Sequence, residues 1–240
     1  IGIVVGHEAQ QVKDAAADIL KSVGIARPIQ AIHQKKQMGS GNAVLEALPF
    51  LKKFKTAMVV CGDTPLLTYE SIYNLFLTHE QLKGQATLLT ARLQNPKGYG
   101  RIVRGALGEV QRIVEESVAT PKELALTEVN SGAYCFEVDA LVQGLKEIGA
   151  KGPKKEHFLT DVMEAIRGKG GRIHAYTSSN SEEIQGINNR AQLSAHRRTG
   201  CFQGAALAFR RLAAWLRFYR AARSRDRQRR KRYTGHTPSG

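Results

Sequence analysis

Cysteine is scarce in this chain, and the little there is forms no pattern. The 240 residues include three scattered cysteines, Cys61, Cys135 and Cys201. Their spacing excludes a cysteine-based metal site, and the seven histidines do not cluster as ligands either. No signal peptide is recognisable, and no apolar run approaches the length that spans a membrane. We therefore expect a cytoplasmic protein without a membrane span, in which Cys135 packs in the core.

Acidic side chains are nearly absent from one end of the chain. Residues 196–240 hold 12 Arg, 1 Lys and a single acid, whereas residues 1–195 carry 23 basic and 20 acidic side chains. The net charge of +15 is therefore mostly a property of the tail. We predict a main domain over 1–195, long enough to bury a core, followed by an Arg-rich tail over 196–240.

Two interpretations of this tail stay open. Apolar residues recur between its arginines near helical spacing, which is typical of a basic amphipathic arm that binds nucleic acid or an anionic membrane surface. Alternatively, the tail is disordered or an out-of-frame translation, which its abrupt preference for Arg over Lys indicates. Nucleic acid is thus an expected partner only through the tail, because the main domain has no comparable basic excess.

Strand-like and helical segments alternate along the first part of the chain. The apolar pattern predicts strands at 1–5, 28–32 and 56–61, and helices at 8–23, 41–49 and 69–79. This alternation predicts an α/β fold with a mostly parallel sheet. From about 85 to 137 the strand-like runs are joined by short glycine-bearing connections, with a hairpin near 105–108. Helices near 138–147 and 159–168 and a strand at 172–177 complete the predicted domain.

The segment 56–67 is the most informative stretch. An apolar strand ends in Gly-Asp-x-Pro-Leu, where Gly62 allows a turn and Pro65 stops the ladder. Asp63 then lies at the carboxyl edge of a buried strand, where ligands bind in open α/β sheets. A carboxylate there can hold a divalent metal against phosphates, although a simple turn cap would also explain it.

A second motif, Gly39-Ser40-Gly41, follows a predicted strand and precedes a predicted helix. Free N–H groups at a helix start favour anions, and glycine permits close approach. The spacing is that of neither a P-loop nor a dinucleotide fingerprint. Alone, the motif is equally compatible with an ordinary loop.

The order of these and further motifs resembles one family. The chain is similar to the uridylyltransferase domain of the bacterial bifunctional enzyme that makes UDP-N-acetylglucosamine. The matching segments run in family order over about 1–195, at 4–7, 34, 37–41, 62–66, 98–102, 113–115, 128–132, 159–161 and 186–194. The resemblance implies a Rossmann-like nucleotide-diphospho-sugar transferase fold, with a small β-rich subregion facing the sugar.

The same resemblance implies roles for individual residues. Nucleotide binding would fall to Gln34, at the uracil edge, and to Gly39 and Ser40. Substrate binding, to N-acetylglucosamine 1-phosphate, would fall to Gly100, Glu115, Asn130 and Asn188. Mg²⁺ would be held by Asp63 and Asn188. The implied reaction is attack of the sugar phosphate on the α-phosphorus of UTP, which releases pyrophosphate.

The chain also departs from the family pattern. The sequence lacks the family's first strand, the glycine-rich loop that carries the catalytic Arg, and a later Lys. Cys61 stands where the family often has Tyr. The hexapeptide repeats of the acetyltransferase β-helix are missing too. We therefore expect severely reduced turnover from this chain. A non-catalytic sugar-nucleotide-binding remnant with a basic tail, or a product that does not fold stably, are the alternatives, and the oligomeric state is left open.

Overall fold

The structure is a computed structural model, and it describes residues 1–6, 8–22, 24, 29–150 and 155–186. The Arg-rich tail at 196–240 lies outside these residues. The first part alternates strands and helices. Its elements are β1 (Gly2–Val5), α1 (Ala9–Ser22), β2 (Gln30–His33), α2 (Ser40–Glu46), α3 (Leu48–Leu51), β3 (Thr56–Val60), α4 (Tyr69–Leu82) and β4 (Ala86–Arg92).

The second part is richer in strands, as the sequence predicted. Its elements are β5 (Arg101–Arg104), β6 (Val110–Val114), η1 (Glu116–Val118), α5 (Pro121–Leu124), β7 (Glu128–Glu137), α6 (Val138–Leu145), α7 (Asp161–Gly168), β8 (Ile173–Thr177) and η2 (Ser181–Ile184). The predicted hairpin is confirmed, because β5 and β6 pair antiparallel around a turn in which the Gly108 N–H donates to the Gly105 carbonyl.

The main sheet is mixed, which corrects the prediction of a mostly parallel sheet. Its strand order is β6-β5-β7-β4-β8, and β3 also pairs with β7. The strands β3, β4 and β8 run in one direction, but β7 lies antiparallel between β3 and β4. The reason is the connection: β7 follows the β5–β6 hairpin and the short helix α5, so no helical crossover returns it in the parallel sense.

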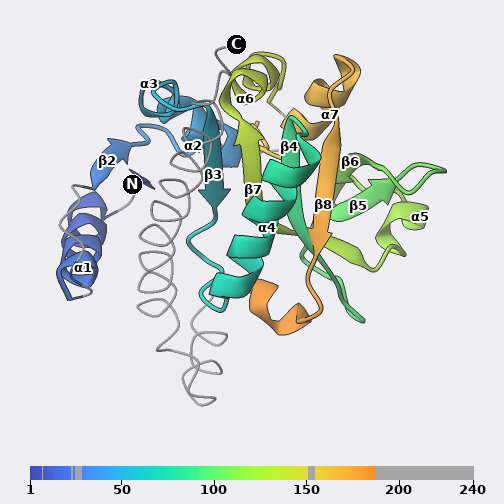
Figure 1. Ribbon diagram of the computed structural model, residues 1–240, viewed down its shortest axis with the longest axis horizontal. Helices are drawn as coiled ribbons and strands as arrows, with labels where there is room; N and C mark the ends of the chain where they lie inside the picture. Colours follow the sequence, from blue (N-terminus) through green and yellow to red (C-terminus); the bar gives the residue numbers. More distant parts are fainter. Residues whose placement is uncertain (7, 23, 25–28, 151–154, 187–240) are drawn as a thin grey trace, which may run out of the picture.

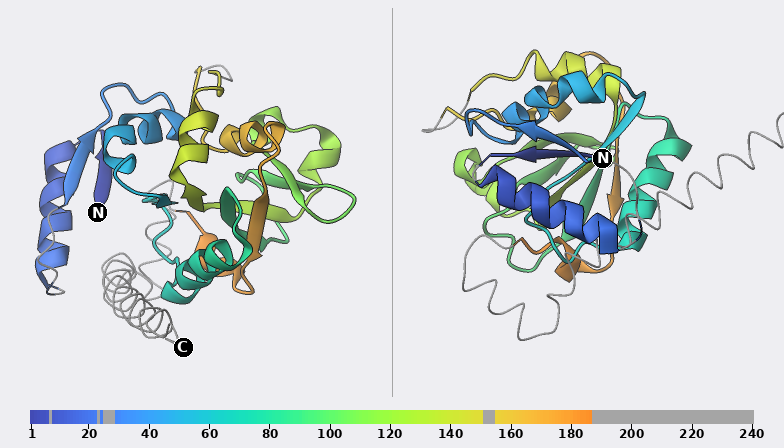
Figure 2. Two further views of the ribbon diagram at one scale, coloured as in Figure 1. Left: turned by 45° about the horizontal axis from the view of Figure 1, so that its top comes forward. Right: turned by 90° about the vertical axis from the view of Figure 1, so that its left-hand side faces the viewer.

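A separate two-stranded parallel sheet is formed by β1 and β2. Val4 and Ile32 pack from it against the main hydrophobic core. With α1 it forms one side of the molecule in both Figure 1 and Figure 2, opposite the β5–β6 hairpin and α5. The β1–β2 sheet and the β5–β6 hairpin therefore lie on opposite sides of the central strands.

The core lies on both faces of β4 and β7. On one face, Leu88 and Phe136 pack in the cluster that includes residues of α6 and α7. On the other, Leu89 and Cys135 pack against Leu75 of α4, which lies over the sheet in Figure 1. Alternate residues of each strand thus serve opposite layers. Cys135 is fully buried, which confirms its predicted core role, and burial raises the pKa of its thiol to about 12.

One helical prediction needs adjustment. The helix predicted over 41–49 is divided at Ala47, because Pro49 occupies the first turn of α3, where a missing N–H costs nothing. Within the described residues, no helix combines the length and the hydropathy needed to cross a membrane.

Candidate active site

Asp63 lies in an exposed turn directly after β3, as the sequence predicted. The turn is held by a hydrogen bond from Thr64 Oγ1 to the Cys61 carbonyl at 3.0 Å and by burial of Leu67 behind it. The Asp63 carboxylate is therefore presented to solvent by a fixed loop. Among the described residues, no group of three or more His, Cys, Asp and Glu side chains is arranged to hold a metal ion.

Cys61 connects this turn to β7. Its N–H donates to the Gly132 carbonyl at 3.3 Å, and a Cβ at Gly132 would lie 2.8 Å from the Cys61 sulfur. Gly132 has a φ of 78°, which other residues adopt only with strain. Burial, followed by the charges of Asp63 and Glu115, raises the pKa of the Cys61 thiol to about 11. The thiol is thus protonated at neutral pH and lies within electrostatic reach of both carboxylates.

Asn130 occupies an irregular part of β7, where the pairing with β4 shifts register between Leu88 and Thr90. Its side-chain amide donates to the Tyr134 hydroxyl at 2.7 Å, and its side-chain oxygen accepts from the Gly132 N–H at 3.3 Å. Its own backbone N–H donates to the Gly100 carbonyl at 2.9 Å. The structure therefore brings Asn130 and Gly100 together across two strands.

Glu115 lies next to the same pair. A Cβ at Gly100 would lie 3.5 Å from Glu115 Oε2 and 3.1 Å from the Ile113 side chain, so glycine leaves room beside the carboxylate. Burial raises the pKa of the Glu115 carboxyl, and a 2.8 Å hydrogen bond from Thr160 Oγ1 partly offsets this effect. Gly100, Glu115 and Asn130 therefore form one cluster, which we call the β5–β7 site.

The Gly-Ser-Gly motif lies at the predicted strand–loop–helix junction, between β2 and α2. Gly39 has a φ of 93°, and a Cβ there would lie 2.6 Å from the His157 carbonyl. The Ser40 hydroxyl accepts from the Leu159 N–H at 3.0 Å, and the Gly41 N–H donates to the His157 carbonyl at 2.7 Å. This loop is therefore docked on residues 157–159, which the sequence analysis had left without a role.

Gln34 stabilises the same loop from the end of β2. Its side-chain amide donates to Asn42 Oδ1 at 2.8 Å and to the Gly39 carbonyl at 3.2 Å. The predicted nucleotide residues Gln34, Gly39 and Ser40 are thus adjacent. The segment 157–159 connects them to the β5–β7 site, because the next residue, Thr160, donates a hydrogen bond to Glu115. Asn188 lies outside the described residues.

Thr160 is the residue that the sequence analysis missed. It is 4% exposed and precedes α7, so its sequence position indicated only a helix start. The signal that could have found it is the Leu159-Thr160-Asp161 match, one of the segments that carry the family resemblance. The role of its hydroxyl group becomes evident only in the folded chain, where it bonds Glu115.

Comparison with known proteins agrees with this geometry. Residues 1–205 match the nucleotidyl transferase family. The chain belongs to this family. It is 41% identical over 192 residues to the bifunctional protein GlmU of Halalkalibacterium halodurans and 38% identical over 192 residues to that of Bacillus subtilis. Each match covers 80% of this chain and 40% of the relative, so the chain spans well under half of their length.

Solved structures show the same fold. A UDP-glucose pyrophosphorylase complexed with UDP-glucose superposes with a TM-score of 0.59 at 16% identity, over 82% of this chain and 80% of that one. A putative glucose-1-phosphate thymidylyltransferase from Bacillus anthracis gives a TM-score of 0.57 at 19% identity, over 75% and 68%. The predicted nucleotidyltransferase-type α/β fold is therefore confirmed, and the resemblance drawn from the motifs is confirmed with it.

Proposed function

We propose that this chain is a sugar-phosphate uridylyltransferase that forms UDP-N-acetylglucosamine and pyrophosphate from UTP and N-acetylglucosamine 1-phosphate. The observation that carries the proposal is the β5–β7 site. Three residues from separate segments converge there, and Thr160 links them to the loop that holds Gln34, Gly39 and Ser40. The GlmU relatives match this chain over 192 residues, 80% of its length, at 38% to 41% identity.

In this proposal a phosphate oxygen of the sugar phosphate attacks the α-phosphorus of UTP. The bond from that phosphorus to the oxygen bridging to the β-phosphorus breaks, and pyrophosphate leaves with the electron pair. Gln34, Gly39 and Ser40 bind the nucleotide, while Gly100, Glu115 and Asn130 orient the sugar through its hydroxyl and acetamido groups. Positioning of two anionic reactants supplies much of the rate.

The proposed cofactor is Mg²⁺, held by Asp63 and Asn188. An exposed lone carboxylate at the end of β3 fits this ion, since Mg²⁺ is commonly held by one or two carboxylates, waters and substrate phosphates rather than by an all-protein cage. When bound, Mg²⁺ neutralises charge on the transferring phosphoryl group. We also propose that the protein acts in the cytoplasm, in the synthesis of cell-envelope precursors.

Ligand binding tests the proposal without requiring full turnover. Calorimetric titration of the whole chain with UDP-N-acetylglucosamine and with UDP-glucose, in Mg²⁺, should show tighter binding of the former. Asn130→Ala should remove most of this preference, because the acetamido contact is assigned to the β5–β7 site. Equal affinities for the two sugar nucleotides, or no binding of either, would rule out the proposed substrate.

A catalytic assay separates an enzyme from a binding module. Radiolabelled UTP, N-acetylglucosamine 1-phosphate and Mg²⁺ should yield labelled UDP-N-acetylglucosamine at a severely reduced rate, and Asp63→Asn should abolish the product. Glu70→Gln, an exposed change in the first turn of α4, serves as the matched control. Product formation that is unaffected by Asp63→Asn would contradict the role given to this carboxylate.

A further inference from the structure

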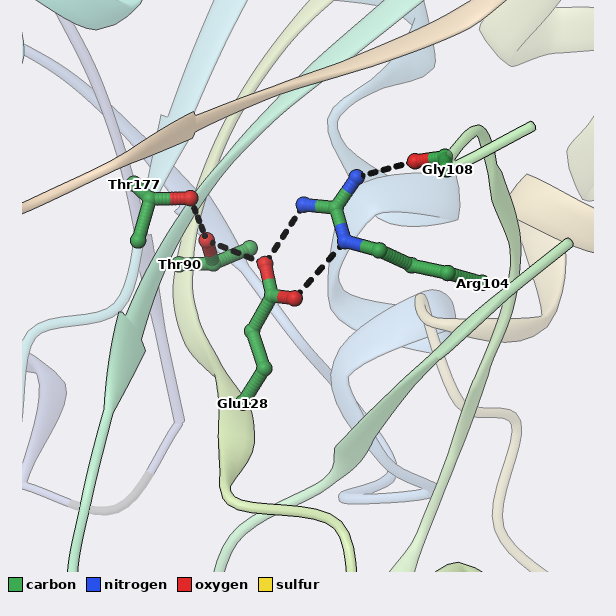
Figure 3. A network of polar contacts seen from close by, with 5 residues as sticks. All are labelled: Thr90, Arg104, Gly108, Glu128 and Thr177. Carbon is green, nitrogen blue, oxygen red and sulfur yellow. Dashed lines mark hydrogen bonds and ion pairs between the residues drawn. The ribbon is translucent and has the colours of Figure 1, made fainter. Parts of the chain in front are cut away.

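A polar network joins four strands beside the β5–β7 site (Figure 3). The Glu128 carboxylate accepts from Arg104 Nε at 2.7 Å and from Arg104 Nη2 at 2.6 Å, so the pair is bidentate. Glu128 Oε1 also accepts from Thr90 Oγ1 at 2.8 Å, and Thr90 Oγ1 lies 2.9 Å from Thr177 Oγ1. The remaining arm of Arg104 donates to the Gly108 carbonyl at 2.6 Å.

The carboxylate of the central ion pair is buried, whereas its guanidinium partner is partly exposed. The side chain of Glu128 is 7% exposed and that of Arg104 is 32% exposed. Burial opposes ionisation of Glu128, but the hydrogen bonds from Arg104 and Thr90 outweigh it and lower the pKa of the carboxyl. A bidentate guanidinium–carboxylate pair of this kind fixes orientation as well as distance.

The network spans the strands that carry the β5–β7 site. Glu128 begins β7 two residues before Asn130, and Thr90 of β4 lies directly opposite Asn130 in the register. Arg104 ends β5, which begins next to Gly100. Gly108 lies in the turn into β6, and β6 leads to Glu115. Each of the three site residues therefore lies on or beside a segment that the network holds.

Backbone pairing holds the hairpin against β7 over only a short stretch. In the described residues, the β5–β7 ladder consists of one Cα pair, Arg101 and Val129, supported by the hydrogen bond from the Asn130 N–H to the Gly100 carbonyl. Ile102 and Ile113 also pack the hairpin into the main core, but apolar packing is non-directional and sets the register of the hairpin less sharply than a bidentate pair does. The Arg104–Glu128 pair supplies a second attachment at the other end of β5.

From this arrangement we propose that Glu128 and Arg104 are positioning residues, which hold the β5–β6 hairpin in register with β7 and thereby shape the sugar-binding part of the site. The inference rests on the proposed function, since the sugar phosphate is the ligand that this part recognises. Neither residue touches the nucleotide loop at Gly39, so the uridine part of a ligand is bound independently of the network.

The test compares two ligands that differ only by the sugar. Dissociation constants for UDP and for UDP-N-acetylglucosamine are measured in Mg²⁺ for the whole chain and for Glu128→Gln and Arg104→Lys. Both variants should raise the dissociation constant for UDP-N-acetylglucosamine roughly tenfold or more, because small misplacements of binding groups have effects of this size. The dissociation constant for UDP should change less than about twofold. Melting temperatures are recorded alongside, and if Glu128→Gln does not fold, Arg104→Lys decides.

The matched control is Glu123→Gln. It removes an ion pair with Arg112 in the same β-rich subregion, but that pair joins β6 to α5 and does not reach β7. It should lower stability without changing the ratio of the two dissociation constants.

An unchanged ratio in both network variants, or a control that shifts the ratio as much as they do, overturns the positioning role. If the unmodified chain binds UDP but gains nothing from the sugar, or binds neither ligand, the proposed function falls and the inference falls with it. The two failures are therefore told apart by the unmodified chain alone.

Discussion

Glu183→Gln removes a negative charge from a buried position at the start of α4. Glu183 is 1% exposed, and its carboxylate accepts three hydrogen bonds. They come from the Thr68 N–H at 3.2 Å, Thr68 Oγ1 at 2.7 Å and Ser71 Oγ at 2.5 Å. Thr68 is also the N-cap of α4, and its side chain accepts from the Ser71 N–H. The substitution therefore weakens the attachment of η2 to the helix start.

The magnitude follows from the lost charge. Hydrogen bonds to a charged group contribute about 1 kcal/mol more than neutral ones. An anion at a helix N-terminus adds about 0.3–1 kcal/mol. Glutamine keeps one acceptor oxygen, so we expect the free energy of unfolding to fall by about 2 kcal/mol in total.

Urea denaturation followed by circular dichroism measures this change, with an unchanged dependence on denaturant as the check for two-state behaviour. Glu182→Gln is the control, because that neighbouring side chain is exposed and should change stability by less than about 0.5 kcal/mol. Equal stabilities for the two variants would refute the reasoning, since it depends entirely on the burial and bonding of Glu183.

Three further predictions address other sites. Burial outweighs the attraction of Glu137 and lowers the pKa of His79 below 6.5. Because the unfolded chain then takes up the proton more readily, stability should be full above about pH 6.5 and fall as the pH drops toward the folded pKa. His79→Gln should flatten this part of the urea-measured profile, and parallel profiles would contradict it. Gly132→Ala should lower the free energy of unfolding by at least about 1–2 kcal/mol, because Gly132 has a positive φ. Adding Cys61→Ala should restore only the part of the lost free energy of unfolding that comes from contact with the Cys61 sulfur. If urea denaturation shows that the double variant regains all of it, the strain argument is refuted. Asp63→Asn should lower the pKa of the Cys61 thiol from about 11 and therefore speed its alkylation at pH ~9. Peptide mass spectrometry measures the alkylation rate. An unchanged alkylation rate would argue against the coupling.

Local chemistry explains which parts of the fold were predictable. Gly62 and Pro65 mark the end of β3, and apolar residues at helical spacing mark α4, so their positions follow from short-range rules. The place of β7 between β3 and β4 does not, because it depends on which strand edges meet in the folded chain. Periodicity assigns strands, and only tertiary packing decides their order and direction.

The site divides in the same way. The residue types at Gly100, Glu115 and Asn130 could be assigned through the family resemblance, yet nothing local in the sequence indicates that one backbone hydrogen bond and one glycine-sized gap bring them together. Residues 157–160 are the clearest example. Their sequence fits an ordinary helix start, but their carbonyl, N–H and hydroxyl groups join the two halves of the candidate site.

This division has a physical consequence for the proposed enzyme. The groups assigned to ligand contact are few and mostly exposed or half-buried, whereas the groups that orient them are buried and bonded to segments distant in the sequence. Glu128, Glu183 and Thr160 are each at most 6% exposed as whole residues, and their side chains bond partners 24 to 115 residues away in the sequence. Because a buried polar group must be bonded or destabilise the fold, each of them makes the geometry of a binding segment depend on the integrity of the core. Substitutions at these supporting positions should therefore change ligand affinity and stability together, whereas changes at the exposed Asp63 carboxylate should act on metal-dependent steps and on the neighbouring Cys61 thiol.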